Sequence, residues 1–232
     1  MYKQITIDNL MKKANELEKQ YLKKAVKEIK ISISNGNKKI GKVMNVSLMP
    51  IKTCGNCKEC KHYCYDIKAC FQYRNVLDAR IRNTVLVKKD RFRYFSEIEK
   101  KIERRKANKY FRWHVSGDII DIDYFDNMVQ IASRHPDFVF WTYTKMYHIV
   151  NEYVSLFGVH SIPENLHIMF SKWDGLKMDN PYGFPIFACR MKDGNKDEMP
   201  WHEMFKCCGN CDICKELNRG CIKGENTYTD EH

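Results

Sequence analysis

The chain has 232 residues, 44% of them apolar, which is enough for one large domain with its own hydrophobic core. This composition excludes a mini-protein that depends on disulfides, and no apolar run is long enough to span a membrane. Lys and Arg number 40 against 29 Asp and Glu, so the formal net charge of +11 fits either a polyanionic partner or, with at least equal weight, solvated faces of amphipathic helices.

The predicted elements follow one another without low-complexity tracts. Apolar periodicity predicts, in chain order, a helix over 8–28, a turn at 34–41, a strand over 42–50, and helices over 71–89 and 91–107. The remaining predicted elements are a strand over 110–117, a helix over 120–135, a strand over 137–145, a helix over 146–158, and strands over 165–173 and 183–191.

This alternation of strands and helices indicates the fold class. Strands with continuous apolar runs are typical of a buried parallel sheet, so we predict an α/β fold, built either as a layered sheet or as a partial (β/α) barrel. We expect three parts: a basic N-terminal helix and turn in 1–43, an α/β core with the first cysteine run in 44–193, and a small Cys-rich metal-binding module in 194–232.

The N-terminal stretch "MYKQITIDNLMKKANELEKQ" has no apolar segment of the kind that signal peptides contain. We therefore expect a cytoplasmic protein without a membrane partner. Thiols stay reduced in that compartment, so eleven cysteines indicate metal or redox chemistry and not a disulfide framework.

Two cysteine runs repeat the motif Cys-Gly-Asn-Cys-x-x-Cys, in which Gly55 and Gly209 give the backbone its freedom to turn. The predicted metal ligands are Cys54, Cys57, Cys60, Cys64, Cys208, Cys211, Cys214 and Cys221. Cys70 and Cys207 lie beside the runs and are further candidates, whereas Cys189 stands alone in an apolar strand and is predicted to be a core residue.

The spacing within each run bears on the metal. The ungapped Cys-x2-Cys-x2-Cys-x3-Cys of the first run is the spacing of bacterial ferredoxin loops and favours a 4Fe–4S cluster over zinc. The second run leaves an auxiliary cluster and a zinc ion equally open. Which cysteines share a centre is left open as well.

The stretch from Cys57 to Cys64, with Tyr63 just before the last cysteine, resembles the cluster loop of radical S-adenosylmethionine enzymes. That family carries Cys-x3-Cys-x2-Cys, and here the two intervals stand in reverse order. The resemblance implies a radical-SAM-like partial barrel, a cluster with an open iron, and Tyr63 among the cofactor contacts.

A second part of this resemblance lies at Ser116-Gly117-Asp118, which is similar to the Gly-Gly-Glu motif that meets the amino group of S-adenosylmethionine. It implies cofactor contacts from these three residues and from Tyr143, with Asp118 and Lys145 as catalytic candidates. Asp118 has an equally weighted alternative as the cap of the following helix. For His114 we favour a structural role.

Three longer blocks resemble the gene product 88 family of phages: "NGNKKIGKVMNVSLMPIKTCGNCKECKHYCYDIKAC", "FRWHVSGDI" and "FWTYTKMYHIV". This resemblance implies a phage or prophage origin and residence in the cytoplasm of a bacterial host. It implies no activity.

The leading hypothesis is an iron–sulfur enzyme, supplied by a reductant, that acts on a nucleotide or nucleic acid held by the basic helices in 1–30 and 80–112. The alternative is a non-catalytic zinc protein that binds nucleic acid, supported by the aromatic residues Phe92, Tyr94 and Phe95 among arginines. A simple electron-transfer module would not need so long an α/β core.

Overall fold

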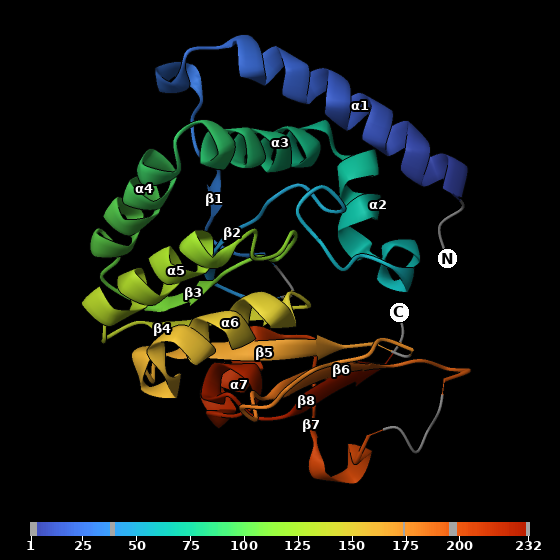
Figure 1. Ribbon diagram of the computed structural model, residues 1–232, viewed down its shortest axis with the longest axis vertical. Coiled ribbons are helices and arrows are strands. Elements are labelled where there is room, and N and C mark those ends of the chain that lie inside the picture. The colour runs from blue at the N-terminus through green and yellow to red at the C-terminus, as the bar shows by residue number, and fades with distance from the viewer. Residues whose placement is uncertain (1–3, 38–39, 174, 195–198, 231–232) are drawn as a thin grey trace. The chain divides into compact units, whose positions relative to one another are not determined.

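The computed structural model describes residues 4–37, 40–173, 175–194 and 199–230. The chain divides into two compact units (Figure 1). The first unit comprises Met1–Ile33, Val46–Lys106 and His114–Asp118. The second comprises Ser34–Asn45, Ala107–Trp113 and Ile119–His232.

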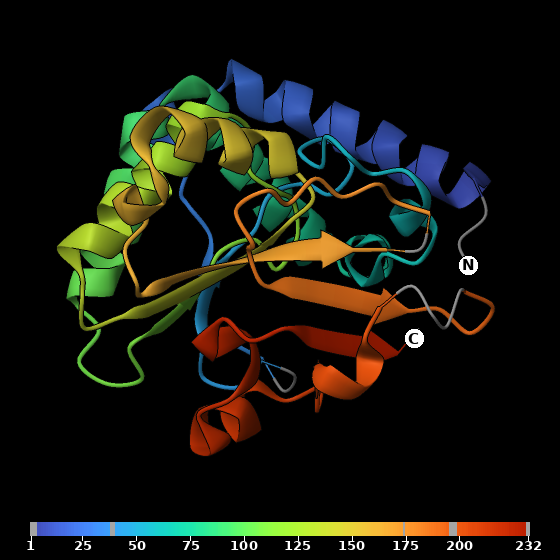
Figure 2. The same cartoon turned by 60° about the horizontal axis from the view of Figure 1, so that its bottom comes forward.

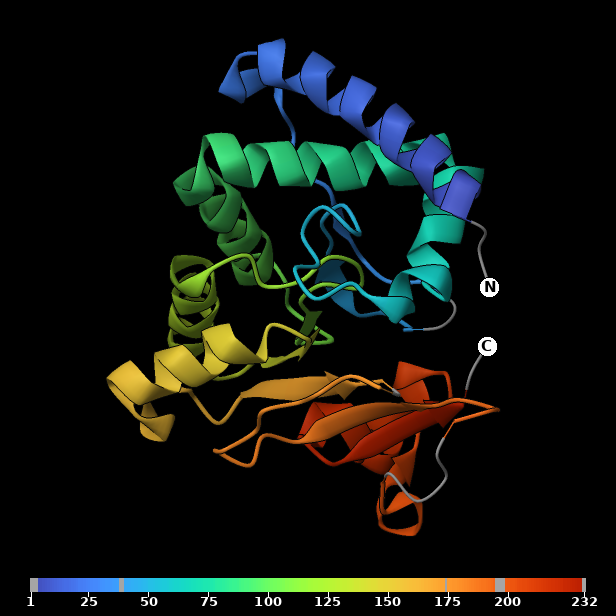
Figure 3. The ribbon, with the colours of Figure 1, turned by 45° about the vertical axis from the view of Figure 1, so that its right-hand side comes forward.

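The first unit is helical. Its helices are α1 (Gln4–Lys23), α2 (Tyr65–Gln72), α3 (Arg74–Lys89) and α4 (Arg91–Glu103), with short 3-10 helices at Val26–Glu28 and Glu59–His62. Figure 3 shows α1 lying along α3, with α2 at one end of this pair. Apolar side chains such as Leu10, Ala14 and Val85 are completely buried there and form the core of the unit.

The helix predicted over 71–89 is wrong at its beginning, because the chain forms two helices in this region. Tyr73 adopts an extended backbone between α2 and α3, so the end of the first cysteine run already belongs to α2. The break between α3 and α4 lies at Asp90, whose side chain caps α4 by accepting from the backbone N–H of Arg93 at 2.9 Å.

The second unit holds most of the sheet. The strands are β1 (Ile33–Ser34), β2 (Met44–Val46), β3 (Tyr110–Arg112), β4 (Val139–Thr144), β5 (Leu166–Lys172), β6 (Ile186–Arg190), β7 (Phe205–Lys206) and β8 (Thr227–Asp230), and all their residues except Ile33 and Val46 belong to the second unit. The order is β1-β2-β3-β4-β5-β6-β8-β7, and the neighbours from β2 to β7 pair in parallel. Figure 2 shows β5, β6 and β8 side by side.

Three helices belong to this unit: α5 (Ile122–Arg134), α6 (Tyr147–Phe157) and α7 (Cys211–Leu217). Short 3-10 helices lie at Val159–Ser161, Trp201–Glu203 and Gly220–Lys223. Successive residues of β4 are buried, including Phe140, Trp141 and Thr142, as expected for a sheet covered on both faces. The prediction of an α/β fold with a mainly parallel sheet is thereby confirmed.

The C-terminal residues contribute to this same sheet. β8 pairs with β6 on one side and with β7 on the other, and both pairings are parallel. The strands predicted over 42–50 and 110–117 are shorter than expected, because only Met44–Val46 and Tyr110–Arg112 pair regularly.

The excess positive charge is concentrated in one of the two units. The first unit carries 24 Lys and Arg against 12 Asp and Glu, and the second carries 16 against 17. The first unit therefore carries a formal net charge of +12, and the second is close to neutral. Within the described ranges, no helix has the length and apolar character needed to cross a membrane.

Candidate functional site

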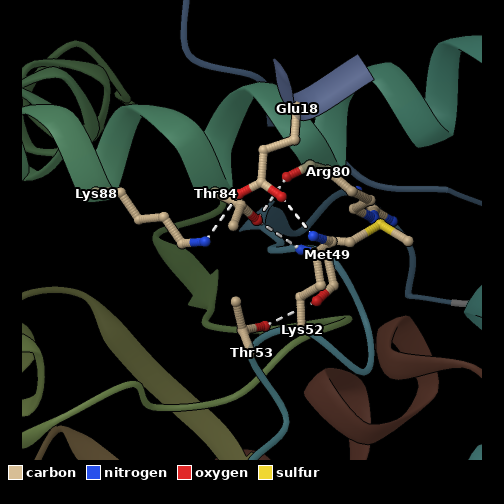
Figure 4. A network of polar contacts seen from close by, with 7 residues as sticks. All are labelled: Glu18, Met49, Lys52, Thr53, Arg80, Thr84 and Lys88. Atoms are coloured by element: carbon tan, nitrogen blue, oxygen red, sulfur yellow. Dashed lines mark hydrogen bonds and ion pairs between the residues drawn. The ribbon is translucent and has the colours of Figure 1, made fainter. Parts of the chain in front are cut away.

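The first cysteine run lies in the first unit, in the chain segment between β2 and α2, and α3 anchors the approach to it (Figure 4). The backbone N–H of Met49 donates to the hydroxyl of Thr84 at 2.8 Å, and that hydroxyl donates to the carbonyl of Arg80. Thr53 in turn donates its hydroxyl to the carbonyl of Met49 at 2.9 Å. These bonds fix the backbone immediately before Cys54.

A buried carboxylate provides a second anchor. Glu18 of α1, 8% exposed, accepts from Lys52 through one oxygen and from Lys88 of α3, at 2.8 Å, through the other (Figure 4). Burial raises the pKa of Glu18, but the hydrogen bonds and charges of the two lysines outweigh it, so the pKa lies below its ordinary value. Lys52 is thus held two positions before Cys54.

The Ser116-Gly117-Asp118 turn packs on the same segment. The backbone N–H of Leu48 donates to the carbonyl of Ser116 at 2.9 Å, and the Tyr65 hydroxyl donates to the carbonyl of Val115, 50 residues away. A Cβ on Gly117 would lie 2.7 Å from Leu48 Cβ and from Thr53 Oγ1. The turn is therefore in direct contact with the residues on either side of the cysteine loop.

Unusual backbone conformations surround this contact. Ile51 has a φ of 69°, an outlier for a β-branched residue, and buried His114 has a φ of 51°. Gly117, at 83°, adopts a conformation that glycine tolerates. Strained residues of this kind gather at functional sites and persist only where the surrounding packing enforces them.

Two polar side chains of the turn are buried. Ser116 is 7% exposed and Asp118 is 4% exposed. The hydroxyl oxygen of Ser116 has no hydrogen-bond partner within the described residues. The helix cap is Asp121, which accepts from the backbone N–H of Tyr124 at 2.8 Å, so the alternative of Asp118 as the cap of α5 is wrong.

Sulfur atoms of the first run approach one another. Cys57 and Cys60 have their Sγ atoms 3.8 Å apart. Hydrogen bonding with Cys54 and Cys60, together with burial, raises the pKa of Cys57 strongly. Two thiolates on one tetrahedral metal with bonds of about 2.3 Å lie roughly 3.8 Å apart. In the described part of the chain, no three Cys, His, Asp or Glu side chains converge as the ligands of a metal ion do.

Two further cysteines of this region, Cys64 and Cys70, lie at the start of α2 and within it. Cys64 is the residue before its first turn, and burial raises its pKa to about 12. Cys70 is buried, and its Sγ lies 3.5 Å from Asp66 Oδ2. Arg80 donates two hydrogen bonds to the carboxylate of Asp66, at 3.0 and 3.1 Å. Tyr63 is half-buried, and its backbone N–H donates to the carbonyl of Cys60 at 3.1 Å.

The second cysteine run lies in the second unit, in and around α7. The Sγ atoms of Cys208 and Cys214 are 3.5 Å apart. Cys207 and Cys208 both act on the pKa of Cys211, which burial raises. The side chain of Asn210 caps α7 by accepting from the backbone N–H of Asp212 at 2.9 Å. Gly209, at a φ of 71°, uses the conformational freedom that its position in the motif predicts.

Tyr143 forms a hydrogen bond with a cysteine of the second run, Cys221. Burial raises the pKa of Cys221 to about 12, while a hydrogen bond from the Tyr143 hydroxyl and the charge of Arg112 act in the opposite direction. The Arg112 guanidinium lies 4.5 Å from the centre of the Tyr143 ring. Arg112 ends β3, and sequence reasoning missed it, because the strand predicted over 110–117 placed Arg112 in its interior.

Other predicted residues have simpler surroundings. Lys145 is half-buried, with its Nζ 5.7 Å from the Trp173 ring centre. Tyr94 and Phe95 are buried in the core at 0% and 4% exposure, so the prediction that they stack on nucleic acid is wrong, and Phe92 alone of the three is exposed. Cys189 is buried, as predicted.

Comparison with known proteins is informative for one part of the chain. Neither the curated proteins nor the solved structures contain a match. The family model described as Gene product 88 matches residues 9–182, a range that includes the first cysteine run and the Ser116-Gly117-Asp118 turn and ends before the second run. The chain belongs to the Gene product 88 family.

Proposed function

We propose that the first cysteine run and the Ser116-Gly117-Asp118 turn form the centre of an iron–sulfur enzyme that binds S-adenosylmethionine. The contact between these two segments carries the proposal. A cluster loop and an amino-group-binding turn must adjoin each other to share one cofactor, and the 2.9 Å bond from Leu48 to Ser116 joins the turn to the segment that leads into the cysteine run.

The residues of the centre fit distinct roles. Cys57, Cys60 and Cys64 would hold the cluster, with Cys54 as a further ligand candidate. The carboxylate of Asp118 would accept hydrogen bonds from the ammonium group of the cofactor. Ser116 has a buried hydroxyl oxygen without a partner in the described chain, as expected for a group that contacts a bound ligand.

A reduced cluster held by these cysteines, together with S-adenosylmethionine, would supply radical chemistry through reductive cleavage of the sulfonium bond. The chain's own contribution is to hold the loop still. Thr53, Thr84 and the Glu18–Lys52 pair fix the backbone segment that leads into the cysteines. Parallel strands in sequential order from β2 to β6 also suit a partial barrel.

The substrate class follows from charge. The first unit, which contains the proposed centre, has 24 basic against 12 acidic residues. A nucleotide or nucleic-acid substrate would be drawn to this unit.

Zinc is a second candidate, chiefly for the second run. The 3.5 Å separation of the Cys208 and Cys214 sulfurs is close to the roughly 3.8 Å expected for two thiolates on one zinc ion. The Cys57–Cys60 separation of 3.8 Å is close to the same value, so the ungapped ferredoxin spacing of the first run, and not the sulfur distance, favours a cluster there. A zinc ion in the second run beside a cluster in the first is the combination that we propose.

Anaerobic purification with analysis of iron, sulfide and zinc tests this assignment. We expect a brown protein with iron and sulfide, and one zinc per chain. The double variant Cys57→Ser/Cys60→Ser should lose the iron and keep the zinc. Cys189→Ser, which changes a buried cysteine outside both runs, is the matched control and should keep both. A colourless protein with zinc and no iron would refute the cluster.

A further inference from the structure

One side of α2 exposes aromatic and basic side chains together. At 100° per residue, Tyr65, Lys68, Phe71 and Gln72 fall within one third of the helix circumference. The opposite side consists of Asp66, Ile67 and Cys70, all buried. The short helix therefore has a side that packs on the first unit and a side that faces solvent.

The aromatic residues on the solvent side are large and accessible. Tyr65, Phe71 and Tyr73, the last at the C-terminal end of the helix, are 48%, 46% and 58% exposed. A packed core does not require such exposure, and three aromatic rings within nine residues are more than the scattered apolar residues of an ordinary surface. The arrangement indicates a contact surface.

Cations lie among these rings. The Lys13 Nζ of α1 is 5.0 Å from the centre of the Phe71 ring. Lys68 and Arg74 are exposed on either side of Phe71 in the sequence. Together with the excess positive charge of the first unit, these groups give the surface a positive potential. Such a potential favours an anionic partner over an apolar protein surface.

We propose that this surface, defined by Tyr65, Lys68, Phe71 and Tyr73 with Lys13 and Arg74 beside them, binds single-stranded nucleic acid. Accessible aromatic faces stack on unpaired bases, and the interleaved cations contact the phosphates. A duplex offers its phosphates but keeps its bases stacked on each other, so the rings select single strands. The inference rests on exposed residues of α1, α2 and α3 and is independent of which metal the cysteines bind.

Fluorescence anisotropy of the full-length protein with labelled oligothymidine tests this surface. Phe71→Ala and Tyr73→Ala should each weaken binding about five- to hundredfold, because stacking on an aromatic ring contributes roughly 1–3 kcal/mol per base. Phe71→Leu keeps an apolar side chain without a ring and should weaken binding as Phe71→Ala does, whereas Phe71→Tyr should retain it.

Two further variants separate stacking from general charge attraction. Lys68→Gln should lower the slope of log affinity against log salt by about 0.7, the value expected for one phosphate contact on a single strand. Phe92→Ala removes an aromatic side chain of the same unit that is 84% exposed and lies between Arg91 and Arg93. It should leave affinity unchanged.

The inference is overturned by equal affinity for duplex and single strand together with unchanged binding by the aromatic variants. A second result would also overturn it. In that result, Phe71→Ala and Tyr73→Ala bind vesicles of anionic lipid more weakly than the wild type does, but bind the oligonucleotide as tightly. Thermal unfolding of each variant checks folding, and should Phe71→Ala destabilise the protein, Tyr73→Ala decides because Tyr73 is the more exposed of the two.

Discussion

The backbone N–H of Leu48 donates to the carbonyl oxygen of Ser116 at 2.9 Å, which joins the segment before the first cysteine run to the Ser116-Gly117-Asp118 turn. The Tyr65 hydroxyl makes a second bond, to Val115, from the far end of the run. The turn is therefore held from both sides of the cysteine loop. Changes in either segment are expected to disturb the other.

Gly117→Ala tests this packing. The new Cβ would lie 2.7 Å from Leu48 and Thr53 atoms at a φ of 83°, so we expect a loss of about 2–5 kcal/mol in the free energy of unfolding from overpacking and backbone strain. Gly183→Ala is the matched control, because Gly183 has a φ of 70° and a Cβ added there would meet no atom within 4 Å. It should cost about 1–2 kcal/mol. Equal losses in urea unfolding would contradict close packing at Gly117.

Glu18→Gln tests the buried anchor. Because the pKa of Glu18 is lowered in the folded protein, its charge stabilises the fold above the pKa of the unfolded chain, and this contribution is lost as the pH falls through the folded pKa. We expect the variant to be about 1–3 kcal/mol less stable at pH 7. The difference should shrink below about pH 4.

Denaturant unfolding across this pH range measures the effect. Glu16→Gln, which removes an exposed carboxylate from the same helix, should show little change at any pH. A difference between wild type and Glu18→Gln that stays constant from about pH 7 to about pH 3 would count against the ion pair.

Cys70→Ser tests whether Cys70 is a ligand of the proposed cluster or only lies near the ligands. The Cys70 sulfur lies 3.5 Å from the Asp66 carboxylate, which Arg80 already holds, so we expect this variant to keep its full iron content. Cys60→Ser should lose its iron. Iron analysis of the two anaerobically purified variants checks the prediction, and iron loss in Cys70→Ser would make Cys70 a ligand.

Tyr143→Phe tests the surroundings of the second run. Removal of the hydroxyl that hydrogen-bonds Cys221 should weaken zinc binding about 10- to 100-fold, as for other groups that orient metal ligands. Competition with a chromophoric chelator measures the affinity. Tyr182→Phe, which changes an exposed tyrosine of the same unit, is the control. Unchanged zinc affinity in Tyr143→Phe would remove Tyr143 from this site.

The fold was predictable where apolar periodicity is strong. The patterns over 120–135 and 146–158 correspond to α5 and α6, and the strands β4, β5 and β6 lie within their predicted ranges. The pattern fails after Arg112, where His114 and Gly117 take positive φ angles that end the strand. It also predicts no strand after 193, because β7 and β8 are short and β8 is mostly only half-buried.

The candidate site was predictable in part. The resemblance implies that the first cysteine loop and Ser116-Gly117-Asp118 share a cofactor, but no sequence pattern indicates the anchors Glu18, Thr53 and Thr84, since they act through tertiary hydrogen bonds. Gly209 has the predicted positive φ angle, whereas Gly55 is not among the described glycines that have a positive φ. The same sequence motif therefore adopts different backbone conformations in the two runs.

Cleavage of S-adenosylmethionine tests the central claim most directly. Iron-loaded protein is incubated anaerobically with dithionite and S-adenosylmethionine, and the products are separated by chromatography. We predict methionine and 5′-deoxyadenosine in equal amounts from the wild type, and none from an Asp118→Ala variant that keeps its iron. Iron-loaded wild-type protein that releases no 5′-deoxyadenosine would contradict the claim.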